Sequence, residues 1–157
     1  MMMKFKPEIE KALVKINFVE KYEALSNSSR EVYDLEEIIV DLDKLKIEEI
    51  FNELGYTSKY VKKENFYKVG EYGDKKDIYF AFHISINVDV LEFIWVVYHN
   101  NELRLGMPWA AYSRLLISPN TIIKPPLFSD YGELKKILVK SLEMYEQFKD
   151  VLIEEYM

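Results

Sequence analysis

The chain of 157 residues contains no cysteine, and it has only two histidines, five glycines and five prolines. Without cysteine it cannot form disulfides, thiolate metal sites or a thiol nucleophile. Histidine is the usual general base and zinc ligand, yet His83 and His99 fit no HxH, HxxxH or HExxH spacing. We therefore expect no cofactor, no metal site and no catalytic residue, and we predict that the protein is not an enzyme.

Long apolar runs are missing as well. Six charged residues interrupt the first stretch, MMMKFKPEIEKALVKINF: Lys4, Lys6, Glu8, Glu10, Lys11 and Lys15. Such a stretch fits neither a signal peptide nor a membrane span. We expect a cytoplasmic protein that does not bind membranes, and the lack of cysteine suits that reducing compartment.

The net charge of −6 is unevenly distributed along the chain. Residues 20–53 hold 11 acidic and 4 basic residues, a net charge of −7, whereas residues 54–76 hold 3 acidic and 6 basic residues, a net charge of +3. Because the acidic third repels a polyanion, nucleic acid is a poor partner and a cationic protein is a better one. The alternative is that acidic helices only keep the protein soluble.

The N-terminal part reads mainly as helix. Pro7 suits a first helical position, and the apolar spacing predicts an amphipathic helix over residues 7–25 that ends at the polar run SNSSR. The stretch KIEEIFNELGY predicts a second helix with Gly55 as its stop residue. Between the two helices, LEEIIVDLD fits a strand or a helix. Residues 56–69 have the bias of a strand or an irregular hairpin.

The middle of the chain predicts strands. In IYFAFHISI, apolar residues alternate with mixed ones, and in VLEFIWVVYHNNELRLGM two strand-like runs flank Asn100 and Asn101. Asn tolerates positive φ, so a two-residue hairpin turn is expected there. With His99 opposite Glu102, we assign to the core face Ile94, Val96, Tyr98, Leu103, Leu105 and Met107. The other face then holds Phe93, Trp95, Val97, His99, Glu102, Arg104 and Gly106.

The C-terminal part predicts a connection and a long helix. Proline-rich SPNTIIKPPLF reads as extended chain, and Asp130 with Glu133 has the spacing of a capping box. The predicted class is α+β, with an antiparallel sheet of central hairpin strands packed by N-terminal and long C-terminal helices, in a single domain of residues 1–157.

Two sets of residues are candidates for binding a partner. The non-core face of the sheet gathers Tyr79, His83, Trp95 and Arg104, and large aromatics with arginine are enriched at interface centres. The alternative is that a helix covers this face, so that Trp95 belongs to the core. The acidic third contributes the second set: Glu36, Glu37, Asp41 and Asp43.

The second half of the chain resembles uncharacterised bacterial proteins that include immunity proteins of toxin systems. The resemblance rests on FAFHISINVDVLEFIWVVY, on LGMPW and on PPLFSDYGELKKILVKSLEMYEQFKDVL, and it covers about half of the chain. Such proteins are small, acidic, cysteine-poor α+β chains that bind and neutralise a cognate toxin and catalyse no reaction. The resemblance implies the same role here and transfers no binding residue.

The sequence thus favours a non-enzymatic protein-binding module, an immunity protein that neutralises a basic toxin. The alternative is a small-molecule-binding domain or enzyme whose pocket opens on the sheet face, with Tyr79, His83 and Arg104 as polar groups. A homodimer formed through the terminal helix is a third possibility.

Overall fold

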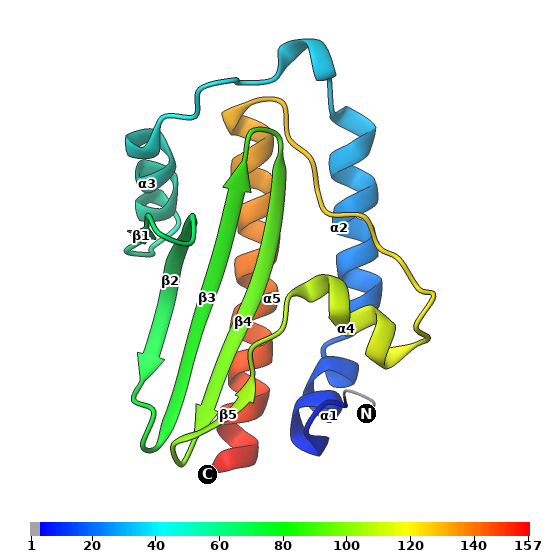
Figure 1. The fold of residues 1–157 in the computed structure, drawn as a ribbon, viewed down its shortest axis with the longest axis vertical. Helices are drawn as coiled ribbons and strands as arrows, with labels where there is room; N and C mark the ends of the chain where they lie inside the picture. Colours follow the sequence, from blue (N-terminus) through cyan, green and yellow to red (C-terminus); the bar gives the residue numbers. More distant parts are fainter. Residues whose placement is uncertain (1–3) are drawn as a thin grey trace.

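The computed structural model describes residues 4–157, so residues 1–3 of the predicted domain lie outside the described residues. A five-stranded antiparallel sheet, in the order β1-β2-β3-β4-β5, carries helices on one of its faces (Figure 1). The predicted α+β class, with an antiparallel sheet and a long C-terminal helix, is confirmed.

The predicted N-terminal helix is in fact two helices, α1 (Pro7–Lys15) and α2 (Phe18–Val32). The break falls at Asn17, whose φ of 57° lies in the left-handed region that Asn tolerates. The prediction that SNSSR ends the helix is wrong. Ser26 and Ser29 lie inside α2 and are buried, where Ser26 donates to the Lys124 carbonyl and Ser29 accepts from the Leu127 N–H. These serines join α2 to the extended connection instead of ending the helix.

The ambiguous LEEIIVDLD segment is neither a strand nor an α-helix. It contains the short 3-10 helix η1 (Leu35–Glu37) and otherwise irregular chain up to α3 (Lys44–Glu53). Gly55 follows α3 with a φ of 89°, which confirms it as the stop residue.

The strands follow one another as hairpins: β1 (Lys59–Val61), β2 (Phe66–Gly73), β3 (Ile78–Asn87), β4 (Val90–His99) and β5 (Glu102–Leu105). The predicted turn at Asn100 and Asn101 is confirmed, because both have positive φ and His99 pairs with Glu102. Of the two alternatives for residues 56–69, a strand or an irregular hairpin, the hairpin is present, as β1 and the start of β2.

The assignment of the β4 faces is wrong, because the core face holds Trp95 and not Ile94 or Val96. Phe82 pairs with Trp95 across the β3–β4 hairpin, so the two side chains share one face, and both are 0% exposed. Ile94, Val96 and Tyr98 are half-buried on the opposite face. The register also shifts by a bulge between Val97 and Tyr98, so that Leu105 is buried while Leu103 is 49% exposed.

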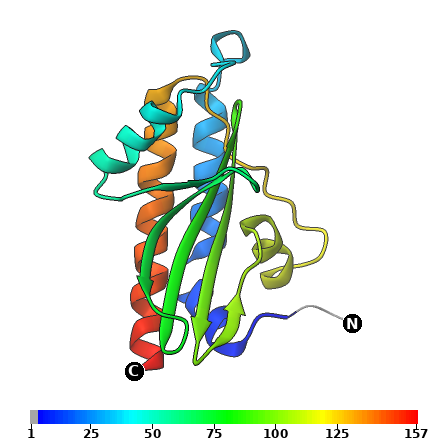
Figure 2. The ribbon, with the colours of Figure 1, turned by 60° about the vertical axis from the view of Figure 1, so that its left-hand side comes forward.

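Helix α5 (Tyr131–Tyr156) lies along the core face of the sheet (Figure 2), and Trp95 stacks on Phe148 with ring centroids 4.5 Å apart. Asp130 caps α5 as predicted, because it accepts from the Glu133 N–H at 2.7 Å. The return bond differs from that of a capping box, because Glu133 accepts from the N–H of Ser129, one residue before the N-cap, at 3.1 Å. Helix α4 (Trp109–Leu116) lies beside β4 and adds buried Trp109 to this aromatic core.

Candidate functional site

The loop of residues 33–43 crosses one end of the molecule, from the end of α2 to the start of α3 (Figure 1). It carries four of the predicted partner-binding residues, and all four are exposed: Glu36, Glu37, Asp41 and Asp43. We call residues 32–45, together with the β3–β4 turn that contacts them, the acidic end.

The loop of residues 33–43 is held in place by three hydrogen bonds, one to the β3–β4 turn and two to Ser129 and Tyr131 at the start of α5. The Tyr33 hydroxyl donates to Asp89 in the β3–β4 turn. The Asp34 N–H donates to the Ser129 hydroxyl at 3.1 Å. At the other end of the loop, the Asp43 N–H donates to the Tyr131 hydroxyl at 3.0 Å. A loop fixed in this way loses less conformational entropy when a partner binds.

Among residues 4–157, none of these four carboxylates takes part in an ion pair. The lysines nearest in sequence lie over tyrosine rings instead, Lys44 at 4.0 Å from the Tyr60 centroid and Lys46 at 5.1 Å from that of Tyr131. Asp43 also accepts from the Leu45 N–H at 2.9 Å and so caps α3. The other three carboxylates have no such structural role.

Exposed aliphatic side chains lie between the carboxylates. The exposed fraction is 67% for Leu35, 74% for Val40 and 68% for Leu45, and Val32 and Val88 are exposed at the same end. Large aliphatic side chains gathered on a surface often mark a site of protein contact. Sequence reasoning missed these residues, although LEEIIVDLD, an apolar-rich segment without a helical or strand period, was a signal for Leu35 and Val40.

The tip of the β3–β4 turn has an unfavourable backbone. Val88 has a φ of 52°, and this left-handed region is costly for a β-branched residue. Its side chain is 45% exposed, so no burial offsets the cost. Glycine or asparagine would fit this backbone conformation with less strain. The valine places an exposed aliphatic group beside Asp89, which is bonded to Tyr33 of the acidic loop.

Tyr79 and His83 lie where they were predicted, on the sheet face turned away from α5. We call this face the open face. It consists of the outward side chains of β2, β3 and β4 around His83 and Ile94.

His83 stacks on Phe66 with ring centroids 4.2 Å apart. Burial, together with the charge of Lys68, lowers the pKa of His83. The Tyr79 hydroxyl donates to Glu71 at 2.8 Å, and burial followed by this hydrogen bond raises the pKa of Tyr79.

Trp95 and Arg104 are not part of the open face. Trp95 is 0% exposed because it lies on the opposite face of the sheet, beneath the helices. It belongs to the core, although the face that carries Tyr79 and His83 is not the one that the helices cover. The Arg104 guanidinium donates to both carboxylate oxygens of Glu8, at 2.7 and 2.9 Å, and also to Glu102 at 2.8 Å. The structure thus places Tyr79 and His83 on one face of the sheet, four residues apart along β3. It leaves the four carboxylates at the acidic end, and it buries Trp95 in the core and pairs Arg104 with Glu8 and Glu102.

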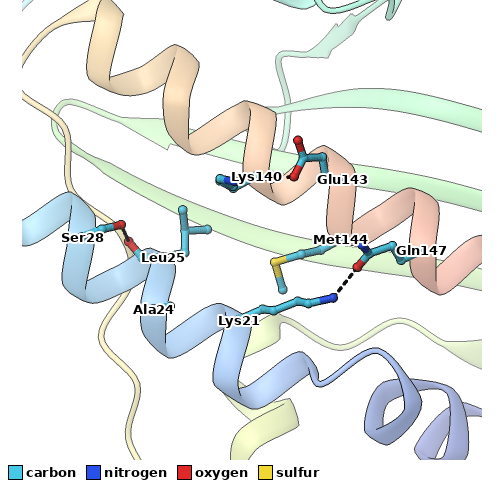
Figure 3. Close-up of a pocket in the computed structure, with 8 residues that line it drawn as sticks. All are labelled: Lys21, Ala24, Leu25, Ser28, Lys140, Glu143, Met144 and Gln147. Carbon is cyan, nitrogen blue, oxygen red and sulfur yellow. Dashed lines mark hydrogen bonds and ion pairs between the residues drawn. The ribbon is translucent and has the colours of Figure 1, made fainter.

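The helical side carries a groove between α2 and α5 (Figure 3). Leu25 and Met144 form part of its wall, and Lys21 crosses it to donate to Gln147 at 2.6 Å. Tyr79, His83 and Arg104 line neither this groove nor the hollows beside α3 and α1. The three residues proposed to line a small-molecule pocket on the sheet are therefore not gathered in any of these hollows.

Three comparisons with known proteins complete the description of the site. No protein-family model, no curated protein and no solved structure matches the chain.

Within residues 4–157, no helix is both long and apolar enough to cross a membrane. The same residues contain no group of three or more His, Asp or Glu side chains placed to hold a metal ion. The acidic end and the open face remain as the candidate surfaces.

Proposed function

We propose that the protein is a cytoplasmic, non-enzymatic binding module that covers a cationic surface of another protein with its acidic end. The observation that carries this proposal is the acidic end itself, where exposed carboxylates without ion-pair partners among residues 4–157 alternate with exposed aliphatic side chains on a tethered loop. We further propose that the partner is a basic toxin and that the protein acts as its immunity protein.

The two kinds of side chain have different physical roles in such a complex. Carboxylates such as Glu36, Glu37 and Asp41 attract a cationic partner over a distance and speed the encounter. Leu35, Val40 and Leu45 then lose their exposed surface at contact, and full burial of one such side chain contributes about 1.5–3 kcal/mol. Charge therefore sets mainly the association rate, and aliphatic burial sets mainly the lifetime of the complex.

The immunity role rests on two further points. An inhibitor of this kind needs no catalytic group, because covering the functional surface of the toxin is sufficient. The second half of the chain also resembles proteins that act in this way. A toxin with a basic surface is the partner class that the unneutralised carboxylates of the acidic end would recognise.

The test is capture of partners from an extract of the host with the full chain. We expect one basic protein in about a 1:1 ratio, and we expect the variant E36K/E37K/D41K to lose most of it. The matched control is E23K/D150K/E154K, which changes net charge equally through three exposed carboxylates on α2 and α5. This control should retain most of the captured protein.

Two results would count against the proposal. Capture of no protein near stoichiometric amounts would remove the binding role, and equal loss in both triple variants would make net charge alone responsible. Identification of the neighbouring reading frame separates the immunity role from the general one, because a secreted protein with a basic C-terminal domain is expected there.

A further inference from the structure

A hollow of about 460 Å³ lies between β2 and the chain that joins α3 to β1. Residues 55–59 form one of its walls, and residues 68–71 of β2 form the other. Strand β1 pairs with β2 only over residues 66–68, so the chain before β1 diverges from β2 at this point (Figure 1). The hollow therefore opens at the edge of the sheet, where β1 begins.

Two lysines stand together at one end of this hollow. Lys59 on β1 and Lys68 on β2 are directly opposite each other in the strand register, where like charges are destabilising. Among residues 4–157, neither ammonium group takes part in an ion pair or lies over an aromatic ring. Lys44, Lys46 and Lys75, in contrast, each lie over a tyrosine ring. An anion between Lys59 and Lys68 would remove their repulsion.

The rest of the hollow is mostly polar. Thr57 and Ser58 contribute hydroxyl groups, which can donate or accept hydrogen bonds. The one carboxylate in the walls is that of Glu71, which accepts a hydrogen bond from the Tyr79 hydroxyl at 2.8 Å. The C-terminal end of α3, which disfavours anions, lies beside Gly55, four residues along the wall from the lysines. An anion is therefore expected at the lysine end of the hollow.

We propose that this hollow binds a small phosphorylated molecule, with its phosphate group between Lys59 and Lys68 and its organic part along Thr57 and Ser58. A phosphate monoester carries a charge of about −1.5 to −2 at pH 7, which matches two lysines. The volume of about 460 Å³ leaves room for more than the phosphate group, and hydroxyl-bearing walls suit a sugar. A small ligand also avoids the repulsion that the acidic third exerts on a polyanion.

The neighbouring His83 gives this site a spectroscopic reporter. His83 pairs with Lys68 across β2 and β3. Burial and then the charge of Lys68 lower the pKa of His83, whereas the charges of Glu64 and Glu71 raise it. A phosphate group bound to Lys68 adds negative charge beside the ring, so the pKa of His83 should rise. The other histidine, His99, lies at the end of β4 and serves as an internal reference.

NMR titration of the two histidine rings in the full chain tests the proposal, with ribose 5-phosphate, inorganic phosphate and ribose added at constant ionic strength. We expect ribose 5-phosphate to bind with a dissociation constant of about 1 mM, to move the titration of His83 to higher pH and to leave the His99 signals unchanged. Ribose should have no effect. Tighter binding of ribose 5-phosphate than of inorganic phosphate identifies a sugar phosphate as the ligand, and equal binding identifies free phosphate.

Three variants test the assigned residues. K59Q and K68Q should each weaken the binding of ribose 5-phosphate at least about fivefold, because each removes one of the two charges that hold the phosphate. K68Q should also raise the pKa of His83 without any ligand. Lys59 is exposed, so K59Q should keep the wild-type fold. The control is K62Q, which removes an exposed lysine that does not line the hollow and should bind as the wild type does.

Three results would overturn the proposal. The first is a His83 ring that does not respond to ribose 5-phosphate or inorganic phosphate up to about 20 mM. The second is an equal response of His83 and His99, and the third is the same dissociation constant in the wild type, K59Q and K62Q. The partner of the acidic end takes no part in these measurements, so failure of this site and failure of the immunity role are separable.

Discussion

The two ends of the molecule use charge in opposite ways. At the end formed by α1, β5 and the last turn of α5, Glu8 receives two hydrogen bonds from Arg104 and one from the Tyr156 hydroxyl at 2.6 Å. At the acidic end, Glu36, Glu37 and Asp41 receive no ion pair from the described part of the chain. The first set of charges holds three elements together, whereas the second set remains available to another molecule.

The paired end also affects the titration of Glu8. Burial alone would raise the pKa of Glu8, but hydrogen bonds from Arg104 and Tyr156 outweigh it and lower the pKa from 4.5 to about 2. The folded structure therefore stabilises the charged form of Glu8. We therefore expect the paired end to determine stability and the acidic end to determine binding.

Removal of Arg104 should give the largest effect. In R104M the half-buried Glu8 carboxylate loses its bidentate partner, and we expect a loss of about 2–3 kcal/mol in the free energy of unfolding, measured by urea denaturation. The matched control is K135M, which breaks the exposed Lys135 pair with Glu53 at the same N···O distance of 2.7 Å. That change should cost less than about 1 kcal/mol. If R104M and K135M lost equal amounts of unfolding free energy, the ion pair of Glu8 would be no more important for stability than an exposed pair.

Lowering the pH should destabilise the protein through Glu8, at the same end of the molecule. Because the pKa of Glu8 is lower in the folded state, its stabilisation is present above pH 4.5 and is lost as the pH falls from 4.5 towards 2. After allowance for solvent screening, this amounts to about 1–2 kcal/mol. Urea denaturation at a series of pH values should show the loss, and E8Q should flatten it. An identical pH dependence in E8Q would assign the acid sensitivity to other carboxyl groups.

At the acidic end, a change at the strained turn should raise stability. V88N replaces a β-branched residue at a φ of 52° with one that tolerates this region, and we expect a gain of about 0.5–1 kcal/mol in unfolding free energy. The control V40N, at an exposed valine without positive φ, should show no gain. V88N should also weaken capture of the partner, because it removes an exposed aliphatic group. A loss of stability in V88N would show that the turn is not strained.

Neutralisation of the free carboxylates should change stability least. E36Q/E37Q/D41N removes three charges that make no ion pair in residues 4–157, so the unfolding free energy should stay within about 0.5 kcal/mol of the wild type. Asp43 is left unchanged because it caps α3. A loss above about 1 kcal/mol would give these carboxylates a structural role and weaken the contrast between the ends.

Strong local patterns made much of the fold predictable. The Asn100-Asn101 turn, the stop at Gly55 and the long helix capped by Asp130 all follow from neighbouring residues. The face of β4 did not follow, because it depends on the register across the Val88-Asp89 turn, which sets Phe82 beside Trp95. Because this turn has two residues, Asn87 pairs with Val90, and this pairing determines which side of β4 is buried.

The site was predictable only in part. The carboxylates of the acidic third were visible from composition, and so was the outward position of His83 on β3. The pairing of Arg104 with Glu8 joins residues that are 96 positions apart, and no local pattern indicates it. The course of α2 through Ser26 and Ser29 depends likewise on contacts with Lys124 and Leu127, which lie far away in sequence.

The role of the acidic end is tested most directly by the association rate of the captured partner as a function of salt concentration. We predict that the wild-type rate falls steeply as salt rises, and that E36K/E37K/D41K associates at least about tenfold more slowly at low salt with a much weaker salt dependence. The control E23K/D150K/E154K should stay close to the wild type. If all three proteins show the same rate and the same salt dependence, the acidic end does not meet the partner.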